Sequence, residues 1–331
     1  MEFGWGPSEG LTSCHVKHIP PPPPWPPRFA ATGHGGLPHF DADSATAHVS
    51  LQYPTAPFLP EMPLAGDPPL QARLWGANHI RALESTQVLL TLDFAGVTQW
   101  LESADSSHLF PSLESRARNL PTNCVLAFHM PGPLTVLGSA TGLEGIRLWD
   151  VLPLRPLCAR AIGRIAEQVV GRLQSMGHSP LVVLDEPLAC SLDAANPANL
   201  YLLEEAFGPA RRLAARVGVH WCCPPPLDVL LNVDLDYASI DLVRFGDLVR
   251  TRRRTLERWL ARDRVLVLGV IDAADPASDA LARERIAALC LPRESAILVA
   301  PTCGTSTFPL AREVEIARKL NDLATSLKES S

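Results

Sequence analysis

The stretch Val217-Gly-Val-His220-Trp-Cys222 is a short, unbroken apolar run that ends in an imidazole and a thiol. Runs of similar length and composition recur along the chain, at residues 29–32, 88–93, 125–129, 181–185, 237–241, 265–269 and 296–300. Apolar runs without polar alternation are typical of parallel strands that are buried on both faces. The sequence therefore predicts a largely parallel sheet.

Amphipathic stretches separate several of these runs. Residues 157–176, 199–217 and 310–327 place apolar side chains at helical spacing. Eight strands that alternate with helices in 331 residues predict the α/β class and a (β/α)8 TIM barrel. An open, doubly wound sheet is the alternative, but no G-x-G-x-x-G follows the first run, so the main dinucleotide-binding signal is missing.

Composition limits the classes of partner and the domain organisation. A net charge of −6 gives no reason to expect nucleic acid or an anionic membrane as a partner. Eight irregularly spaced cysteines without a secretion signal favour reduced thiols and a cytoplasmic location. The Pro-rich segment 19–27 cannot continue a helix or a sheet. We therefore expect a flexible tail over residues 1–27 and a single catalytic barrel over residues 28–331.

The chemically notable side chains lie at or just after the ends of the predicted strands. They are His34, Asp93, His129, Asp185, Glu186, His220, Cys222, Asp241, Asp272 and Cys303. Active sites of such barrels lie at the carboxyl ends of the strands, so we expect these side chains to meet in one site.

An imidazole and two thiols from separate strand ends form a nitrogen and sulfur ligand set that suits Zn2+. We expect His220, Cys222 and Cys303 to bind the metal, with Asp241 as a fourth ligand or with that position left to water or substrate. The alternative is that these are ordinary buried polar residues, since free cysteine is commonly buried.

Seven short motifs resemble, in order, those of cobalamin-independent methionine synthases. They are Ala31-Thr-Gly-His-Gly-Gly-Leu-Pro-His39, Gly132-Pro-Leu-Thr-Val136, Leu184-Asp-Glu-Pro187, His220-Trp-Cys222, Ser239-Ile-Asp241, Gly269-Val-Ile-Asp272 and Pro301-Thr-Cys-Gly304. The resemblance extends from about residue 30 to residue 310. It covers only the catalytic C-terminal barrel of that family, so the chain looks like a short member of the superfamily that also contains uroporphyrinogen decarboxylases.

The resemblance implies a zinc-dependent transfer of a methyl group to homocysteine or another small thiol. It implies that His220, Cys222 and Cys303 bind zinc and that Asp241 replaces the glutamate ligand of the family. It also implies substrate contacts from His34, Gly35, Gly36 and Asp185, with Glu61 as a stand-in for a further glutamate. Asp185 and Asp272 are the carboxylates that we expect to assist catalysis.

Two departures from the family concern the methyl donor. Ser139 is aligned with a tryptophan that stacks on the folate, and Ala274 with a histidine that protonates it. A folate amine needs a proton to leave, whereas cob(I)alamin does not. We therefore expect methylcobalamin, free or on a corrinoid carrier protein, rather than a methylfolate. Three alternatives remain, namely a folate-dependent homocysteine methyltransferase, a uroporphyrinogen-decarboxylase-like lyase and a non-catalytic paralogue that binds zinc or a corrinoid protein.

Overall fold

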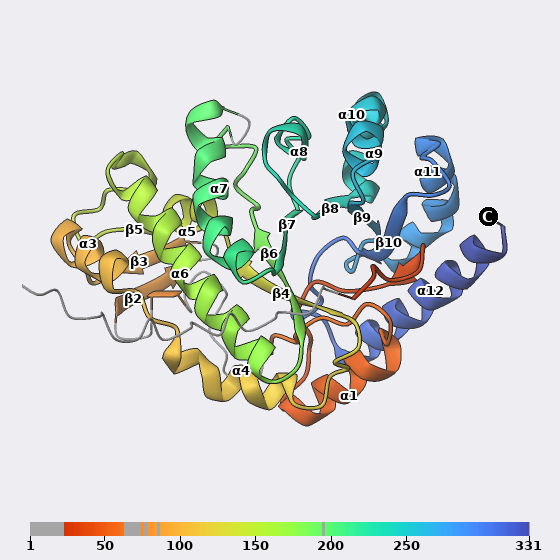
Figure 1. The fold of residues 1–331 in the computed structure, drawn as a ribbon, viewed down its shortest axis with the longest axis horizontal. Coiled ribbons are helices and arrows are strands. Elements are labelled where there is room, and N and C mark those ends of the chain that lie inside the picture. Colours follow the sequence, from red (N-terminus) through yellow and green to blue (C-terminus); the bar gives the residue numbers. More distant parts are fainter. Residues whose placement is uncertain (1–22, 63–73, 76–78, 85–86, 194–195, 331) are drawn as a thin grey trace, which may run out of the picture.

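The computed structural model describes residues 23–62, 74–75, 79–84, 87–193 and 196–330. A curled sheet of seven parallel strands forms its centre (Figure 1). In spatial order the strands are β1 (Ala30–Ala31), β10 (Ala296–Pro301), β9 (Val265–Ile271), β8 (Tyr237–Asp241), β7 (Arg216–Trp221), β6 (Ser179–Asp185) and β4 (Val125–Pro131). The predicted α/β class is confirmed, and seven of the eight predicted strands lie in this sheet, so the structure shows seven strands of the predicted (β/α)8 barrel.

The prediction that residues 88–93 form the second strand of this sheet is wrong. β3 (Gln87–Leu90) instead pairs with β2 (Ile80–Glu84) and β5 (Ala140–Thr141) in a separate three-stranded sheet. Asp93 does not end a strand of the main sheet, because its carboxylate accepts a hydrogen bond from the Gly96 N–H and caps a helix.

Residues 56–61 lie between the two edge strands of the main sheet. An isolated bridge joins Gly36 to Glu61 on one side, and another joins Phe58 to Ala127 of β4 on the other. Pro57 and Pro60 lack a backbone N–H, so this segment cannot form a regular ladder. The main sheet therefore has seven strands, and single bridges from residues 56–61 occupy the position between β1 and β4 that the second strand of a complete barrel would take.

Helices surround the curled sheet (Figure 1). They are α1 (Ala42–Gln52), α3 (Phe94–Ser103), α4 (Phe110–Ala117), α5 (Pro133–Ser139), α6 (Leu154–Ser175), α7 (Pro197–Arg212), α8 (Val229–Asn232), α9 (Leu242–Thr251), α10 (Arg253–Leu260), α11 (Ala282–Leu289) and α12 (Leu310–Glu329). α6 and α7 pack closely, since a Cβ at Gly163 would lie 2.8 Å from Cγ of Pro209. Within the described residues, no helix has the length and hydropathy that crossing a membrane requires.

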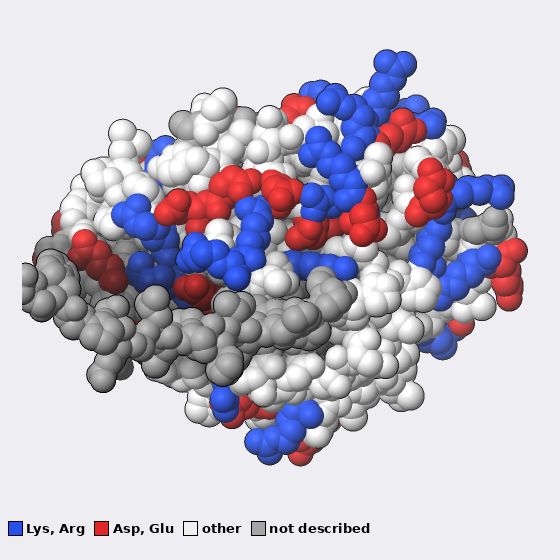
Figure 2. Space-filling model, viewed as in Figure 1, with Lys and Arg blue, Asp and Glu red and all other residues white. Residues whose placement is uncertain are grey.

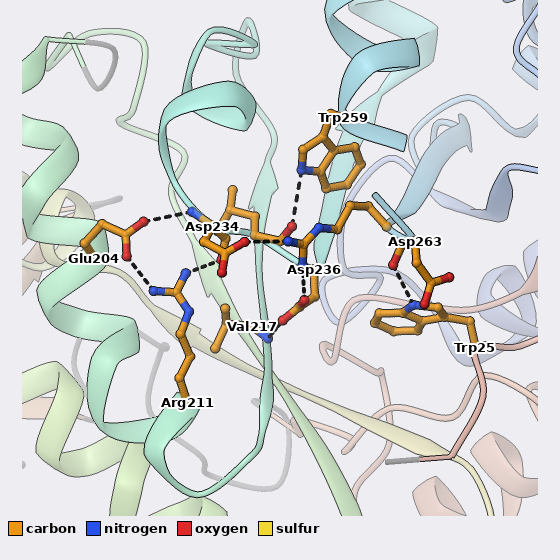
Figure 3. Close-up of polar contacts among 10 residues, drawn as sticks. Trp25, Glu204, Arg211, Val217, Asp234, Asp236, Trp259 and Asp263 are labelled. Carbon is orange, nitrogen blue, oxygen red and sulfur yellow. Dashed lines mark hydrogen bonds and ion pairs between the residues drawn. The ribbon is translucent and has the colours of Figure 1, made fainter. Parts of the chain in front are cut away.

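A polar network ties together the loops at the amino ends of β7, β8 and β9 (Figure 3). Arg264 forms ion pairs with Asp234 and Asp236, and Asp236 accepts a hydrogen bond from the Val217 N–H at 3.0 Å. The guanidinium carbon of Arg216 lies 3.7 Å from the centroid of the Trp25 ring. The indole N–H of Trp25 donates a hydrogen bond to the Asp263 carbonyl at 3.2 Å. Trp25 is therefore packed against the protein, while residues 1–22 of the expected flexible tail lie outside the described residues.

Basic side chains gather over α9 and α10 (Figure 2). Arg252 separates α9 from α10, the two helices that carry these side chains. Acidic neighbours pair with several members, as Asp247 does with Arg250 and Glu257 with Arg253. The charge of this surface is therefore partly neutralised within the protein.

Candidate metal centre

The polar residues that the sequence predicts at the strand ends gather at the carboxyl end of the main sheet. His129 lies in β4, Asp185 ends β6 and His220 lies in β7. Asp185 is the register partner of His220, so the ends of their strands are level. Cys303 follows β10 by two residues, and His34 follows β1 by three. Parallel strands thus deliver side chains from distant parts of the sequence to one place.

Three ligand atoms meet at this end of the sheet. His220 Nε2 lies 3.0 Å from Sγ of Cys222, and the two sulfur atoms of Cys222 and Cys303 lie 3.4 Å apart. All three atoms lie within 4.8 Å of one another. The hydrogen bond from the Cys222 thiol holds the pKa of Cys303 well below its ordinary value, with a further contribution from His220. Even without a metal, the pair therefore favours one thiolate.

These residues fit a zinc ion. One imidazole nitrogen and two sulfur atoms are the soft donor set that zinc prefers, and three protein ligands leave a position for a substrate. His220 is buried, whereas Cys303 is exposed, so one side of the group faces solvent. The second nitrogen of His220, Nδ1, lies 3.0 Å from the Ser239 hydroxyl, which fixes the ring as metal-binding histidines require.

Asp241 is not part of the converging group. Its Oδ1 accepts a hydrogen bond from the Arg244 N–H at 2.9 Å and caps α9. Its Oδ2 is buried and has no hydrogen-bond partner among the described residues, with the Arg244 guanidinium 3.7 Å away. Burial raises the pKa of this carboxyl. The structure thus places Asp241 as a helix cap that keeps one buried oxygen unsatisfied.

Two further histidines surround the ligand group. The ring of His34 stacks on that of His220, with centroids 4.0 Å apart and an interplanar angle of 25°. His34 Nε2 lies 2.9 Å from the Pro301 carbonyl, which can only accept, so Nε2 carries the proton. His129 donates from Nδ1 to Asp185 at 2.9 Å and stands edge-on to His220. His129 therefore fixes the rotation of the Asp185 carboxylate beside the candidate metal ligands.

The predicted substrate-binding turn lies next to this histidine group. Gly35 has a φ of +82°, a conformation that L side chains rarely adopt. A Cβ there would lie 3.3 Å from Cγ of Glu61 and 3.6 Å from Cβ of His129. The Glu61 N–H donates to the Gly35 carbonyl at 2.7 Å. The structure therefore brings Glu61 to the turn formed by His34, Gly35 and Gly36.

Asp272 lies further from the ligand group. Its carboxylate accepts from the Arg244 guanidinium at 3.0 Å and from the Ala274 N–H at 2.9 Å, so it organises the loop after β9. The adjacent residues Asp185 and Glu186 have different partners. Asp185 contacts His129, whereas Glu186 accepts hydrogen bonds from the start of α5. Thr135 and Leu134 donate to the Glu186 carboxylate, yet burial raises its pKa to about 7.

Sequence reasoning gave no role to Ser239, which positions the ring of His220. A signal was present, because Ser239 precedes Asp241 by two residues. Side chains two residues apart in a strand lie on the same face. The opposing residues in the register are Ser239 and His220, which places the hydroxyl beside the imidazole.

Comparisons with known proteins find similarity at the level of the fold. No protein-family description and no curated protein sequence matches the chain. A B12-independent methionine synthase from Shewanella sp. W3-18-1, solved with selenomethionine, has a TM-score of 0.52 and 14% identity over 69% of each chain. A Listeria monocytogenes protein provisionally assigned as a vitamin-B12-independent methionine synthase has a TM-score of 0.53 and 14% identity, covering 93% of this chain and 99% of that one. The chain therefore has a fold like that of these methionine synthases.

Proposed function

We propose that the protein is a zinc-dependent thiol S-methyltransferase that methylates homocysteine or a related small thiol. The observation that carries this proposal is the meeting of His220, Cys222 and Cys303 at the carboxyl ends of parallel strands. The fold similarity to two proteins described as methionine synthases supports it. We further propose that the chain corresponds to a single catalytic barrel from residue 28 onward.

Zinc held by these three side chains would act as a Lewis acid that keeps the acceptor thiol deprotonated at neutral pH. The sulfur of the acceptor then forms a bond to the methyl carbon. The bond between that carbon and the donor breaks, and its electron pair stays on the donor. Ser239 and His34 hold the ring of His220 in place for this role. His129 holds the Asp185 carboxylate, which accepts a hydrogen bond from the ammonium group of the thiol substrate.

Asp241 is proposed as the exchangeable fourth ligand. Its Oδ2 is buried without a hydrogen-bond partner among the described residues, and a buried unsatisfied carboxylate oxygen is costly. Asp272 is proposed to assist catalysis by positioning Arg244, whose guanidinium donates a hydrogen bond to it at 3.0 Å. Arg244 Nε is also 3.7 Å from Asp241, so the two carboxylates share one cation.

The side chain at position 139 is compatible with a methylcorrinoid donor, whereas the descriptions of the neighbours do not support one. The Ser139 hydroxyl donates within α5 to the Thr135 carbonyl at 2.6 Å, and it offers no ring for a pterin to stack on. A cavity of about 260 Å³ that Thr135, Ser139 and Arg147 help to line offers space for part of a donor. Both neighbours are described as independent of vitamin B12, and this description gives a methylcorrinoid or a corrinoid carrier no support. The proposal therefore specifies a thiol as the methyl acceptor, and the assay described below identifies the methyl donor.

A uroporphyrinogen-decarboxylase-like lyase is less well supported. That chemistry needs arginines at the mouth of the barrel to bind substrate carboxylates, and Arg28 is the arginine near the first turn. The Arg28 guanidinium instead donates to the carbonyls of Pro292, Arg293 and Ser295 at 2.6 to 2.8 Å. These contacts hold Arg28 at the loop before β10, away from the strands' carboxyl ends.

The test is a methyl-transfer assay with the zinc-loaded protein and homocysteine. Methylcobalamin and methyltetrahydrofolate are supplied in separate reactions, and methionine is measured. We expect methionine from one donor in the wild type. Cys222→Ala should lose at least about 100-fold, because loss of a residue that merely orients a metal ligand already costs about 10- to 100-fold. A non-catalytic paralogue would bind zinc and form no methionine with either donor, which would overturn the proposal.

A further inference from the structure

The Gly35–Gly36 turn packs against the loop that follows β10. The Thr305 N–H donates to the Gly36 carbonyl at 2.8 Å. A Cβ placed on Gly304 would lie 3.3 Å from Cα of Gly36. Because Gly304 directly follows Cys303, this contact joins the turn to the candidate metal centre.

Ser306 occupies the space that a side chain at position 36 would fill. A Cβ placed on Gly36 would lie 3.2 Å from the hydroxyl oxygen of Ser306 and 3.5 Å from its Cβ. Ser306 is only partly buried, so its hydroxyl can reach a ligand at this rim. The loop thus contributes a hydroxyl where the turn, having glycine, contributes none.

Hydrogen-bond donors concentrate on this side of the centre. In the hydrogen bonds recorded between described residues, the N–H groups of Gly35, Cys303, Gly304 and Ser306 do not take part. Together with the Ser306 hydroxyl, these neighbouring N–H groups are hydrogen-bond donors of the kind that bind anions. Arg244 is already engaged by Asp272 and Asp241, so neutral donors dominate this side. Such a set suits a single negative charge, as on a carboxylate, better than a phosphate dianion.

The other side of the same turn carries hydrogen-bond acceptors. Asp185 keeps a partly exposed carboxylate beside His129, with 17% of its side chain accessible. Glu61 lies against Gly35. A ligand that meets both sides therefore needs a cation near Asp185 and an anion near Ser306. An α-amino acid has this pair of charges.

We propose that Ser306 is a specificity-determining residue that donates a hydrogen bond to the carboxylate of an amino-acid thiol. The proposal rests on the proposed methyl transfer and specifies its acceptor. Ser306 would thereby favour homocysteine over thiols that lack a carboxylate.

The test measures thiol binding to the zinc-loaded protein by calorimetry, independently of methyl transfer. The ligands are homocysteine and homocysteamine, which is homocysteine without its carboxylate. We expect Ser306→Ala to weaken homocysteine binding by about 10- to 100-fold, as loss of a hydrogen bond to a charged group implies. Homocysteamine binding is expected to stay unchanged. Thr307→Ala, an exposed neighbour on the same loop, is the matched control and should change neither affinity.

A double variant tests the position of the hydroxyl. Gly36→Ser combined with Ser306→Gly moves the hydroxyl from the loop to the turn, and we expect homocysteine binding to recover. Equal weakening of both thiols by Ser306→Ala, no weakening, or no homocysteine binding by the wild type would overturn the inference. If homocysteine binds as expected but no donor yields methionine, the proposed methyl transfer fails while the role of Ser306 stands.

Discussion

Glu186 offers a quantitative test of how the site is built. This carboxyl group is fully buried at the start of α5, where it accepts hydrogen bonds from the N–H groups of Leu134 and Thr135 and from the Thr135 hydroxyl. Burial raises its pKa from 4.5 to about 7, although these donors act in the opposite direction. In the folded protein the protonated form is therefore favoured below pH about 7.

The sign of the effect on stability follows from this shift. Below pH about 4.5 the group is protonated in both states, and its contribution to the free energy of unfolding is fully present. As the pH rises to about 7, the unfolded chain loses the proton while the folded protein keeps it. The free energy of unfolding should then fall by about 3 kcal/mol, at about 1.4 kcal/mol for each pH unit of the shift.

Urea unfolding of the wild type and of Glu186→Gln, at about pH 5 and about pH 8, measures this contribution. The variant has no titrating group here, so the wild type should lose about 2 to 3 kcal/mol relative to it across this range. Glu205→Gln, on the exposed face of α7, is the control and should show no such difference. If the wild type instead gains stability relative to Glu186→Gln as the pH rises, the three donors outweigh burial and the reasoning is wrong.

Two further predictions concern the residues around the candidate metal ligands. Asp241→Asn can still cap α9, so its free energy of unfolding should stay within about 1 kcal/mol of the wild type. Its zinc affinity should fall if Oδ2 is a ligand. Unchanged zinc affinity in a metal titration would show that Asp241 serves only as the helix cap. Ser239→Ala removes the hydrogen bond to His220 Nδ1 and should weaken zinc binding by about 10- to 100-fold, while Ser278→Ala, on the neighbouring loop, should not.

The strands were predictable where burial alone determines the residue pattern. β9 is buried at every position, and its sequence is correspondingly an unbroken apolar run. Residues 56–61 were missed because two prolines remove N–H donors and leave only two hydrogen bonds to β4. The run at residues 88–93 was assigned to the wrong sheet, because an apolar run predicts a strand but not the strand with which it pairs.

The site was predictable as far as strand ends determine it. Parallel strands carry His220, Cys222 and Cys303 to the same end of the sheet, and the sequence places them there. The conformation of Asp241 was not predictable, because a helix N-terminus and a metal ion compete for the same carboxylate. The ring stacking of His34 on His220 depends on the path of the turn after β1, which no local pattern specifies.

The central claim, that these three side chains form a zinc site, is tested most directly by the zinc content of the purified protein. Elemental analysis after zinc loading and gel filtration should give about one zinc per chain in the wild type. Cys190→Ala, which changes an exposed cysteine outside the ligand group, should keep this value. Cys303→Ala should lose most of the zinc while the circular dichroism of the folded protein is retained. A wild type without zinc, or a Cys303→Ala variant that keeps it, would contradict the account.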